Sequence, residues 1–301
     1  MFVVPRLHNS SNMNTPVVHY LRTKVYGLNI FYRESGPKDA PTILLLHGYP
    51  TSSHMYRDLI PMLNRNYRVI APDLIGFGFS DAPHYKEFNY TFDNLTKYIQ
   101  GLIDQLRLTR FALQVFDYGA PVGYRLAVAN PEKITAIVSQ NGNAYAEGLS
   151  EGWNPIRKYW EDASEQNRNN LRVMTTNDLT QWQYFTGVSD KSLVAPESYW
   201  LDQFLLDRKD NVELQLDLFK DYASNVALYP TFQEYFREYQ PPFLAGWGNK
   251  DPFFLPAGAE AFKKDLPKAT VKLYDTGHFA LETHGAVIGE EILHFLTTLP
   301  K

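Results

Sequence analysis

Cysteine is absent from the 301-residue sequence, which excludes disulfides, zinc sites built on cysteine and a cysteine nucleophile. Basic charge is scarce as well: the net charge is -4, and no stripe of Lys and Arg could neutralise phosphates, so nucleic acid is not an expected partner. No segment approaches the roughly 20 apolar residues of a membrane helix. The apolar run before Pro5 is too short for a signal-peptide core. We therefore expect a soluble, cytoplasmic protein without a membrane partner.

The composition of the sequence is that of an ordinary globular protein. Hydrophobic residues make up 44% of the chain, enough for a buried core, and charged residues make up 21%. A length of 301 residues favours one core domain with a sizeable insertion over two independent domains. Residues 1–18, which are rich in Asn and Ser, are expected to form a flexible leader outside that core.

Alternating strand and helix patterns predict an α/β fold. Two β-rich runs flank Tyr26-Gly27-Leu28 and suggest an opening hairpin between residues 19 and 34. Apolar runs of strand length then alternate with stretches of helical spacing, as in βαβ units whose parallel sheet is buried on both faces. The strand runs are 42–46, 68–71, 111–116, 134–138, 243–247 and 271–274, and the helical stretches are 55–63, 92–106, 119–129 and 285–296.

This alternation stops near Asn141 and resumes at Pro242. The residues between them are polar, helical in pattern and dense in large aromatic side chains. Such aromatics pack an insertion onto a core, and a cap that closes over an apolar pocket uses the same residue types. We therefore predict a core domain of residues 19–143 and 236–301, with a mostly parallel sheet flanked by helices. A helical cap is inserted at 144–235, after the sixth strand.

The segment around Asp117 has the layout of a nucleophile elbow. The buried strand at 111–116 ends in this acidic residue, the chain turns at once, and the small residues Gly119 and Ala120 follow. Such a turn presents its central side chain at the carboxyl edge of the sheet, near helix N-terminal amides. An aspartate before a helix is also typical of an ordinary N-cap. Taken alone, the segment leaves both interpretations open.

Three other loops decide between them. The His-Gly-Tyr-Pro turn at 47–50 follows the strand at 42–46 and can aim a backbone N–H at the same edge of the sheet. Asp251 follows the strand at 243–247, and His278 follows the strand at 271–274. Nucleophile, acid and histidine in this order, each just past a strand, form the pattern of α/β-hydrolase triads. The pattern favours a catalytic Asp117.

Rival residues fit this pattern less well. Asp275 is nearer to His278 in sequence, but it ends a strand, so Asp251 is the preferred acid. His284 and His294 belong to the final helix, where surface or packing roles suit them better. Ser80 lies in the nearest match to a serine-nucleophile motif, but no convincing helix follows it. The glycines around it form no complete dinucleotide-binding fingerprint.

With these motifs, the chain resembles the α/β-hydrolase fold family and, within it, the epoxide hydrolase and haloalkane dehalogenase branch. The resemblance spans roughly residues 20–299 and includes the glycine-rich loop at 73–81. It implies that Asp117 attacks the substrate and forms an alkyl ester, which water activated by His278 then hydrolyses, with Asp251 holding the histidine. A carboxylate with an ordinary pKa of about 3.9 is ionised at neutral pH and needs no base to attack.

The resemblance also implies the rest of the site. Backbone N–H groups of Tyr49 and Tyr118 would form the oxyanion hole. The lid tyrosines Tyr159 and Tyr222 would donate protons to an epoxide oxygen, with Tyr184 as the rival of Tyr159. No metal or organic cofactor is needed. The predicted lining of the substrate pocket is His47, Pro50 and Tyr184.

The residue at position 49 indicates which of the candidate activities is expected first. Haloalkane dehalogenases typically have Asn or Glu there, so the aromatic Tyr49 looks more like an epoxide hydrolase. Conversion of epoxides to diols is the first expectation, dehalogenation of haloalkanes or haloacids the alternative, and a non-catalytic ligand-binding protein of the same fold the third. Tyr118 replaces a usual tryptophan, and Val115 stands where glycine is common, so the substrate stays open. We expect a small apolar organic substrate and a monomer or homodimer.

Overall fold

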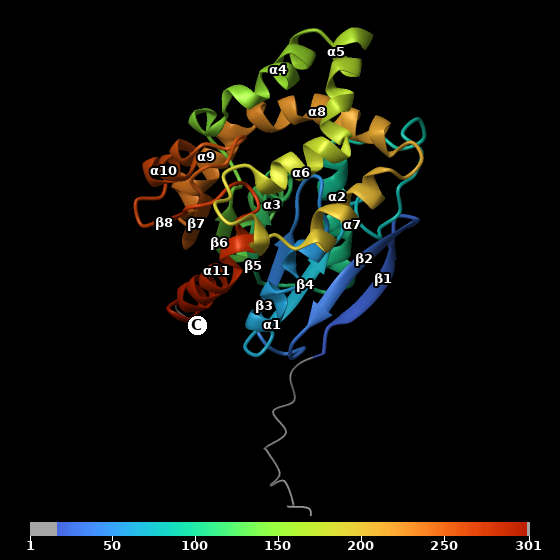
Figure 1. Cartoon of the computed structure of the whole chain (residues 1–301). Coiled ribbons are helices and arrows are strands. Elements are labelled where there is room, and N and C mark those ends of the chain that lie inside the picture. The colour runs from blue at the N-terminus through green and yellow to red at the C-terminus, as the bar shows by residue number, and fades with distance from the viewer. Residues whose placement is uncertain (1–16, 300–301) are drawn as a thin grey trace, which may run out of the picture.

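The computed structural model describes residues 17–299, and residues 1–16 of the expected leader lie outside the described part. An eight-stranded sheet forms the centre, in the order β1-β2-β4-β3-β5-β6-β7-β8 (Figure 1). β2 pairs antiparallel with β1, as the predicted hairpin requires, and antiparallel with β4, while all other neighbours are parallel. The strands are β1 (His19–Val25), β2 (Leu28–Ser35), β3 (Thr42–Leu46), β4 (Arg68–Pro72), β5 (Phe111–Phe116), β6 (Ile134–Gln140), β7 (Phe243–Gly248) and β8 (Thr270–Tyr274).

The inner strands are buried because their sequences are continuous apolar runs. All six residues of β5 are buried. In β3, side chains alternate between the two faces: Leu44 and Leu46 join one hydrophobic cluster, and Ile43 and Leu45 join the other. The prediction was wrong for β8, which was expected to be buried on both faces. It lies at the edge of the sheet, and three of its five residues are exposed.

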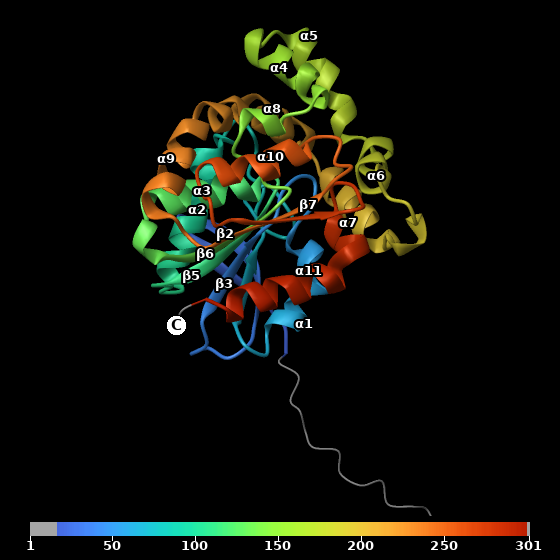
Figure 2. The same ribbon diagram turned by 90° about the vertical axis from the view of Figure 1, so that its left-hand side faces the viewer.

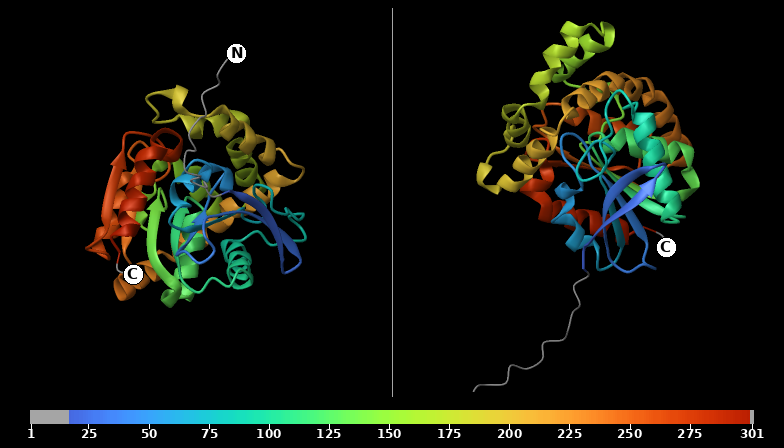
Figure 3. Two further views of the ribbon diagram at one scale, coloured as in Figure 1. Left: turned by 90° about the horizontal axis from the view of Figure 1, so that it is seen from below. Right: turned by 90° about the vertical axis from the view of Figure 1, so that its right-hand side faces the viewer.

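Helices cover both faces of the sheet (Figures 2 and 3). α2, α3 and α9 pack on one face, and α1 and α11 pack on the other. The last helix is kinked: a first turn begins at Ala280, His284 has a non-helical conformation, and the predicted helix from about 285 follows this kink. The core helices are α1 (Leu59–Leu63), α2 (Phe92–Gln105), α3 (Gly119–Ala129), α9 (Tyr229–Tyr239), α10 (Pro256–Ala261) and α11 (Ala280–Thr297), with short 3-10 turns η1 (Ser53–Tyr56), η2 (Pro131–Lys133) and η7 (Phe262–Lys264).

A helical insertion between β6 and β7 forms the predicted cap, which lies above the sheet in Figure 1. The expected boundary at residue 235 falls inside α9, whose Phe232 and Phe236 pack against Tyr124 of α3 with ring centroids 5.5 and 5.4 Å away. α9 therefore belongs to the core layer. No helix between residues 17 and 299 is long and apolar enough to cross a membrane. The cap elements are η3 (Ala146–Gly148), η4 (Glu151–Trp153), α4 (Asn154–Glu161), α5 (Glu165–Asn170), η5 (Leu171–Thr175), α6 (Asn177–Phe185), η6 (Lys191–Leu193), α7 (Pro196–Leu206) and α8 (Asn211–Ala227).

Candidate active site

Asp117 follows β5 in the backbone conformation that an elbow requires. Its φ is +47°, a left-handed conformation that is rare for residues other than glycine. The turn brings α3 so close to β3 that a Cβ at Gly119 would lie 2.1 Å from the carbonyl oxygen of Leu46, so only glycine fits there. The N-cap position of α3 is Tyr118, which makes no side-chain cap. Asp117 is therefore not the N-cap of this helix.

The unusual Val115 is accommodated by a glycine on the facing helix. A Cβ at Gly123 of α3 would lie 2.5 Å from Cγ1 of Val115. The side chain of Val115 is completely buried at this contact. The missing side chain on the helix thus leaves room for the larger one on the strand, and the elbow keeps its shape.

The carboxylate of Asp117 faces the two predicted oxyanion donors. The backbone N–H of Tyr49 donates to Oδ1 at 2.6 Å, and the backbone N–H of Tyr118 also hydrogen-bonds the carboxylate. Gly48 permits this approach, because a Cβ there would lie 2.3 Å from Oδ1 of Asp117. The two donors that the resemblance implies therefore lie at the carboxylate itself.

Asp251 and His278 meet Asp117 from the loops after β7 and β8. Nδ1 of His278 lies 2.7 Å from Oδ2 of Asp251, and its Nε2 lies 3.9 Å from Oδ2 of Asp117. The side chain of His278 is 1% exposed, and that of Asp251 is fully buried. The histidine is thus fixed by one carboxylate, with its other nitrogen turned towards the second.

Asn141, which the sequence analysis did not select, completes this arrangement. Its Nδ2 donates to Oδ2 of Asp251 at 2.6 Å, and its Oδ1 accepts the backbone N–H of Gly248 at 3.2 Å. The other oxygen of Asp251 accepts the backbone N–H groups of Phe253 and Phe254. Asn141 directly follows β6, so the signal that identified Asp117, a polar residue just past a buried strand, could have identified it too.

Burial and charge set the ionisation of the site. Burial raises the pKa of Asp117 to about 6, although His278 and the backbone N–H groups of Tyr49 and Tyr118 act in the opposite direction. The carboxylate is still mostly ionised at pH 7. Burial disfavours the charged form of His278, but the carboxylates of Asp251 and Asp117 outweigh it and raise its pKa.

A family model described as alpha/beta hydrolase fold matches residues 41–285. The chain belongs to this family. The hydrolase is 45% identical over 271 residues to the protein named Uncharacterized hydrolase YNR064C of Saccharomyces cerevisiae, a match that covers 89% of this chain and 93% of the relative. It is 26% identical over 281 residues to a haloalkane dehalogenase of Psychrobacter cryohalolentis, covering 91% and 89% of the two chains.

Solved structures share the fold of this hydrolase. The crystal structure of the haloalkane dehalogenase DbeA from Bradyrhizobium elkani superposes with a TM-score of 0.77 at 21% identity, covering 93% of this chain and 98% of that chain. At this identity the likeness concerns the fold. The relative from Psychrobacter cryohalolentis, which is named a haloalkane dehalogenase, backs the alternative expectation better than epoxide hydrolysis.

Of the predicted lid tyrosines in the hydrolase, Tyr222 lies near the nucleophile. It packs against Tyr118 with ring centroids 5.7 Å apart, and both side chains are buried. Burial, and then the charge of Asp117 among other groups, raises the pKa of both tyrosines well above the ordinary value. Neither hydroxyl makes a hydrogen bond of standard geometry, although that of Tyr222 interacts with Tyr229. Two protonated phenols therefore lie close to the carboxylate.

The other two tyrosine candidates have polar partners of their own. The hydroxyl of Tyr159 accepts a hydrogen bond from Nη1 of Arg168 at 3.0 Å, and that arginine also binds Glu213 and Asp217 on the cap. The hydroxyl of Tyr184 donates to Oδ2 of Asp202 at 2.5 Å. The ring of Tyr184 stacks on Phe279, the neighbour of His278, with centroids 3.8 Å apart. Tyr184 thus packs the cap onto the core beside the histidine.

His47, which was predicted to line the pocket, is held by the backbone through both of its ring nitrogens. It is completely buried, and its Nε2 accepts the backbone N–H of Leu74 at 3.0 Å. Its Nδ1 lies 2.9 Å from the carbonyl oxygen of Gly48, so both ring nitrogens are engaged by backbone. The ring anchors the loop at residues 47–50, here called the oxyanion loop, and neither of its nitrogens is free to hydrogen-bond a substrate. Pro50, also predicted for the lining, is buried in the same loop after a cis peptide bond.

The rejected rivals have ordinary contacts. Ser80 donates to the carbonyl oxygen of Asp73 at 2.7 Å and accepts the backbone N–H of Phe31, which ties the loop after β4 to β2. Asp275 is 65% exposed and pairs with Lys250 on the surface. Neither contact involves His278.

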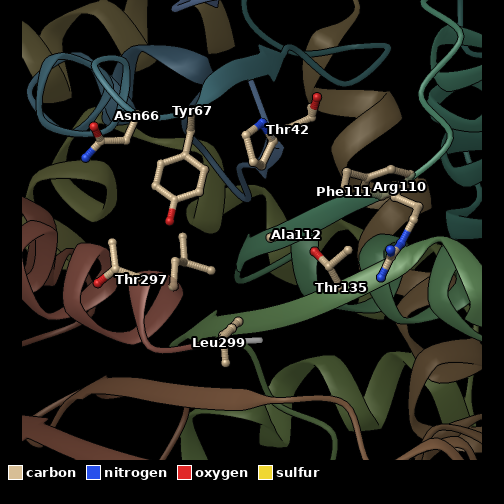
Figure 4. A pocket seen from close by; sticks show the side chains of 11 residues that line it. Thr42, Asn66, Tyr67, Arg110, Phe111, Ala112, Thr135, Thr297 and Leu299 are labelled. Carbon is tan, nitrogen blue, oxygen red and sulfur yellow. The ribbon is translucent and has the colours of Figure 1, made fainter. Parts of the chain in front are cut away.

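A pocket elsewhere in the hydrolase lies at the opposite edge of the sheet (Figure 4). Thr42 and Phe111, which line it, are the first residues of β3 and β5, whereas Asp117 follows the last residue of β5. This pocket is therefore separate from the triad. Within residues 17–299, no group of three or more His, Asp or Glu side chains is arranged to hold a metal ion.

Proposed function

We propose that this hydrolase cleaves a bond between a saturated carbon and its leaving group by way of an alkyl ester on Asp117. The environment of the carboxylate carries the proposal. Oδ1 accepts the N–H of Tyr49 at 2.6 Å, whereas Oδ2 faces Nε2 of His278 at 3.9 Å. Oδ1 is thus placed to become the ester carbonyl oxygen, and Oδ2 to attack. Because the carboxylate is already ionised, the attack requires no base.

The two steps follow from this geometry. Oδ2 attacks the carbon, and the leaving group departs with the electrons of the broken bond. His278 then takes a proton from water, and the resulting hydroxide attacks Cγ of Asp117. The N–H groups of Tyr49 and Tyr118 stabilise the oxyanion, each contributing about 3 kcal/mol. Collapse expels an alkoxide, which regains the proton from His278, and Asp117 releases its remaining proton to solvent.

The comparisons favour a halide as the leaving group. Proteins of similar length and fold are named haloalkane dehalogenases, with 26% identity over 91% of this chain in one case. A halide departs without a proton and needs only donors to stabilise its charge. We therefore propose dehalogenation of small haloalkanes or haloacids as the activity, with halide, alcohol and one proton as products.

Epoxide opening is a second candidate, favoured by the hydroxyls of Tyr118 and Tyr222. An epoxide oxygen leaves as an alkoxide and needs a proton, which a buried phenol can supply. The indole N–H groups of Trp153, Trp160 and Trp247 all donate to backbone carbonyls, so they are not available to a leaving group. The hydroxyls of Tyr118 and Tyr222, whose pKa values are raised in part by the charge of Asp117, are therefore the candidate proton donors.

One experiment separates these activities and tests the shared mechanism. Purified protein is incubated with panels of haloalkanes, haloacids and epoxides, and released halide and diol are measured side by side. Halide release without diol supports dehalogenation, and the reverse supports the second candidate. No turnover on either panel contradicts both and leaves a ligand-binding protein.

The His278→Gln variant tests the ester directly. Without the base, a turned-over substrate should remain attached to Asp117, and intact-protein mass spectrometry should detect the added alkyl mass. A second change, Asp117→Asn in the same variant, should abolish the labelling. Absence of the label in His278→Gln with a substrate of the parent protein would refute the mechanism.

A further inference from the structure

Tyr49 contacts the nucleophile and the cap at the same time. Its backbone N–H donates to Oδ1 of Asp117 at 2.6 Å, while its hydroxyl donates to the backbone carbonyl of Met174 at 2.7 Å. Met174 lies in η5, a part of the cap. Tyr49 therefore provides a predicted oxyanion donor through its backbone and contacts the cap through its hydroxyl.

The ring of Tyr49 is held on the cap side as well. It packs edge-on against Phe219 of α8 with centroids 5.2 Å apart, and against Tyr118 at 5.8 Å. The side chain is 5% exposed. Burial, followed by the charges of Asp117 and Asp202, raises its pKa, so the hydroxyl keeps its proton and stays a donor throughout the working pH range.

The remaining anchors of the loop lie in the core. His47 binds the backbone of Leu74, and the hydroxyl of Tyr56 donates to the carbonyl oxygen of Leu46 at 2.9 Å. These contacts hold the start of the loop but do not include Tyr49. The hydrogen bond to Met174 thus links Tyr49, whose backbone N–H is the oxyanion donor, to the cap.

We infer that the hydroxyl of Tyr49 is a positioning group that couples closure of the cap to the second chemical step. The inference rests on the proposed function. When η5 is packed on the core, Tyr49 is held with its N–H towards Oδ1 of Asp117. When the cap moves away, the backbone N–H of Tyr49 moves with it. An oxyanion develops on Asp117 only during hydrolysis of the ester, so a shifted donor impairs that step and not the preceding attack.

Tyr49→Phe removes the hydrogen bond to Met174 while keeping the ring and the backbone N–H. Rapid-quench mass spectrometry with an accepted substrate would resolve ester formation from ester hydrolysis. We expect ester formation within about twofold of the parent rate, and hydrolysis slowed about tenfold or more. The ester should then accumulate in the steady state, so that kcat and KM fall together.

Ser198→Ala is the matched control. It also removes a hydroxyl that joins the cap to the core, because Oγ of Ser198 donates to Glu282 at 3.1 Å, but it does not touch the oxyanion loop. Its ester should be hydrolysed at the parent rate within about twofold. Circular dichroism and thermal unfolding of both variants check that each is folded.

The outcomes distinguish the inference from the proposed function. If His278→Gln traps an ester but Tyr49→Phe hydrolyses it normally, or slows both steps equally, the inference is overturned and the function stands. Equal slowing of hydrolysis in Ser198→Ala also overturns it, since any loosened cap would then have the same effect. If His278→Gln traps no ester, the function and the inference fail together.

Discussion

Replacement of Asp117 by Asn should abolish turnover and stabilise the fold at neutral pH. The carboxylate is buried, and burial raises its pKa from the ordinary 3.8 to about 6. The folded protein therefore disfavours the ionised form that the proposed chemistry needs. Asn has the same shape, and its oxygen can still accept the N–H of Tyr49. The variant removes the charge and preserves the contact.

The magnitude follows from the two pKa values. A difference of about 2 between the folded and unfolded states corresponds to about 3 kcal/mol, at 1.36 kcal/mol for each pKa unit. The pKa of about 6 already includes the attraction of His278, which lowers the pKa of Asp117, so this figure is a net cost. We expect Asp117→Asn to raise the free energy of unfolding by about 1 to 3 kcal/mol at pH 8.

The pH dependence has a definite sign. Below about pH 3.8 Asp117 is protonated in both states, so its ionisation costs the fold nothing. As pH rises from 3.8 towards 6, the unfolded chain releases its proton first and the parent protein loses stability relative to the variant. Above about pH 6 the difference is complete. The gain from the Asn variant should therefore grow between pH 4 and pH 7 and then level off.

Urea unfolding of both proteins at steps of pH between 4 and 8 measures this gain. Asp39→Asn, which removes an exposed carboxylate after β2, is the control and should give a difference near zero at every pH. The reasoning is wrong if Asp117→Asn is equally or less stable at pH 8, or if its advantage is as large at pH 4 as at pH 8. Either result would mean that the fold does not penalise the charge of the nucleophile.

Three further predictions concern activity. The kcat/KM of the parent protein should fall tenfold per pH unit below about pH 6, as Asp117 becomes protonated, and a flat rate profile between pH 4.5 and 7 would contradict this. Asn141→Leu removes the 2.6 Å donor to Asp251 and should slow ester hydrolysis about 10- to 100-fold in rapid-quench assays while ester formation stays near normal; equal slowing of both steps would count against it. Gly48→Ala places a Cβ 2.3 Å from Oδ1 of Asp117 and should lower kcat about 100-fold or more in a protein whose circular dichroism is unchanged, whereas parent-like turnover would show that the loop can yield.

Much of the fold could be predicted from the sequence, because buried parallel strands are continuous apolar runs. Each predicted strand is present with its ends within two residues. The edge position of β8 was missed, although Lys272 in the middle of this strand is a residue typical of exposed edge strands. The first turn of α11, between Ala280 and the kink at His284, was not predicted, because it almost adjoins His278, with only Phe279 between them.

The site was predictable to the extent that it lies on strand ends. The sheet brings Asp117, Asp251 and His278 to one edge, so their sequence positions were sufficient to associate them. The tyrosines of the cap were not predictable in this way, because the direction of a helical side chain depends on packing between distant segments. Tyr159 faces Arg168, whereas Tyr222 faces Tyr118, and nothing local in the sequence separates the two.

The chain order of the triad also has a consequence for biosynthesis. The ribosome makes Asp117 and the whole cap well before it makes His278, and β8 and α11 are the last described elements in chain order. A nascent chain released before residue 278 would carry the proposed nucleophile without its base. Any such fragment that folded far enough to react would be alkylated once and never regenerated. Under the proposed mechanism, turnover therefore requires a chain that extends at least to His278.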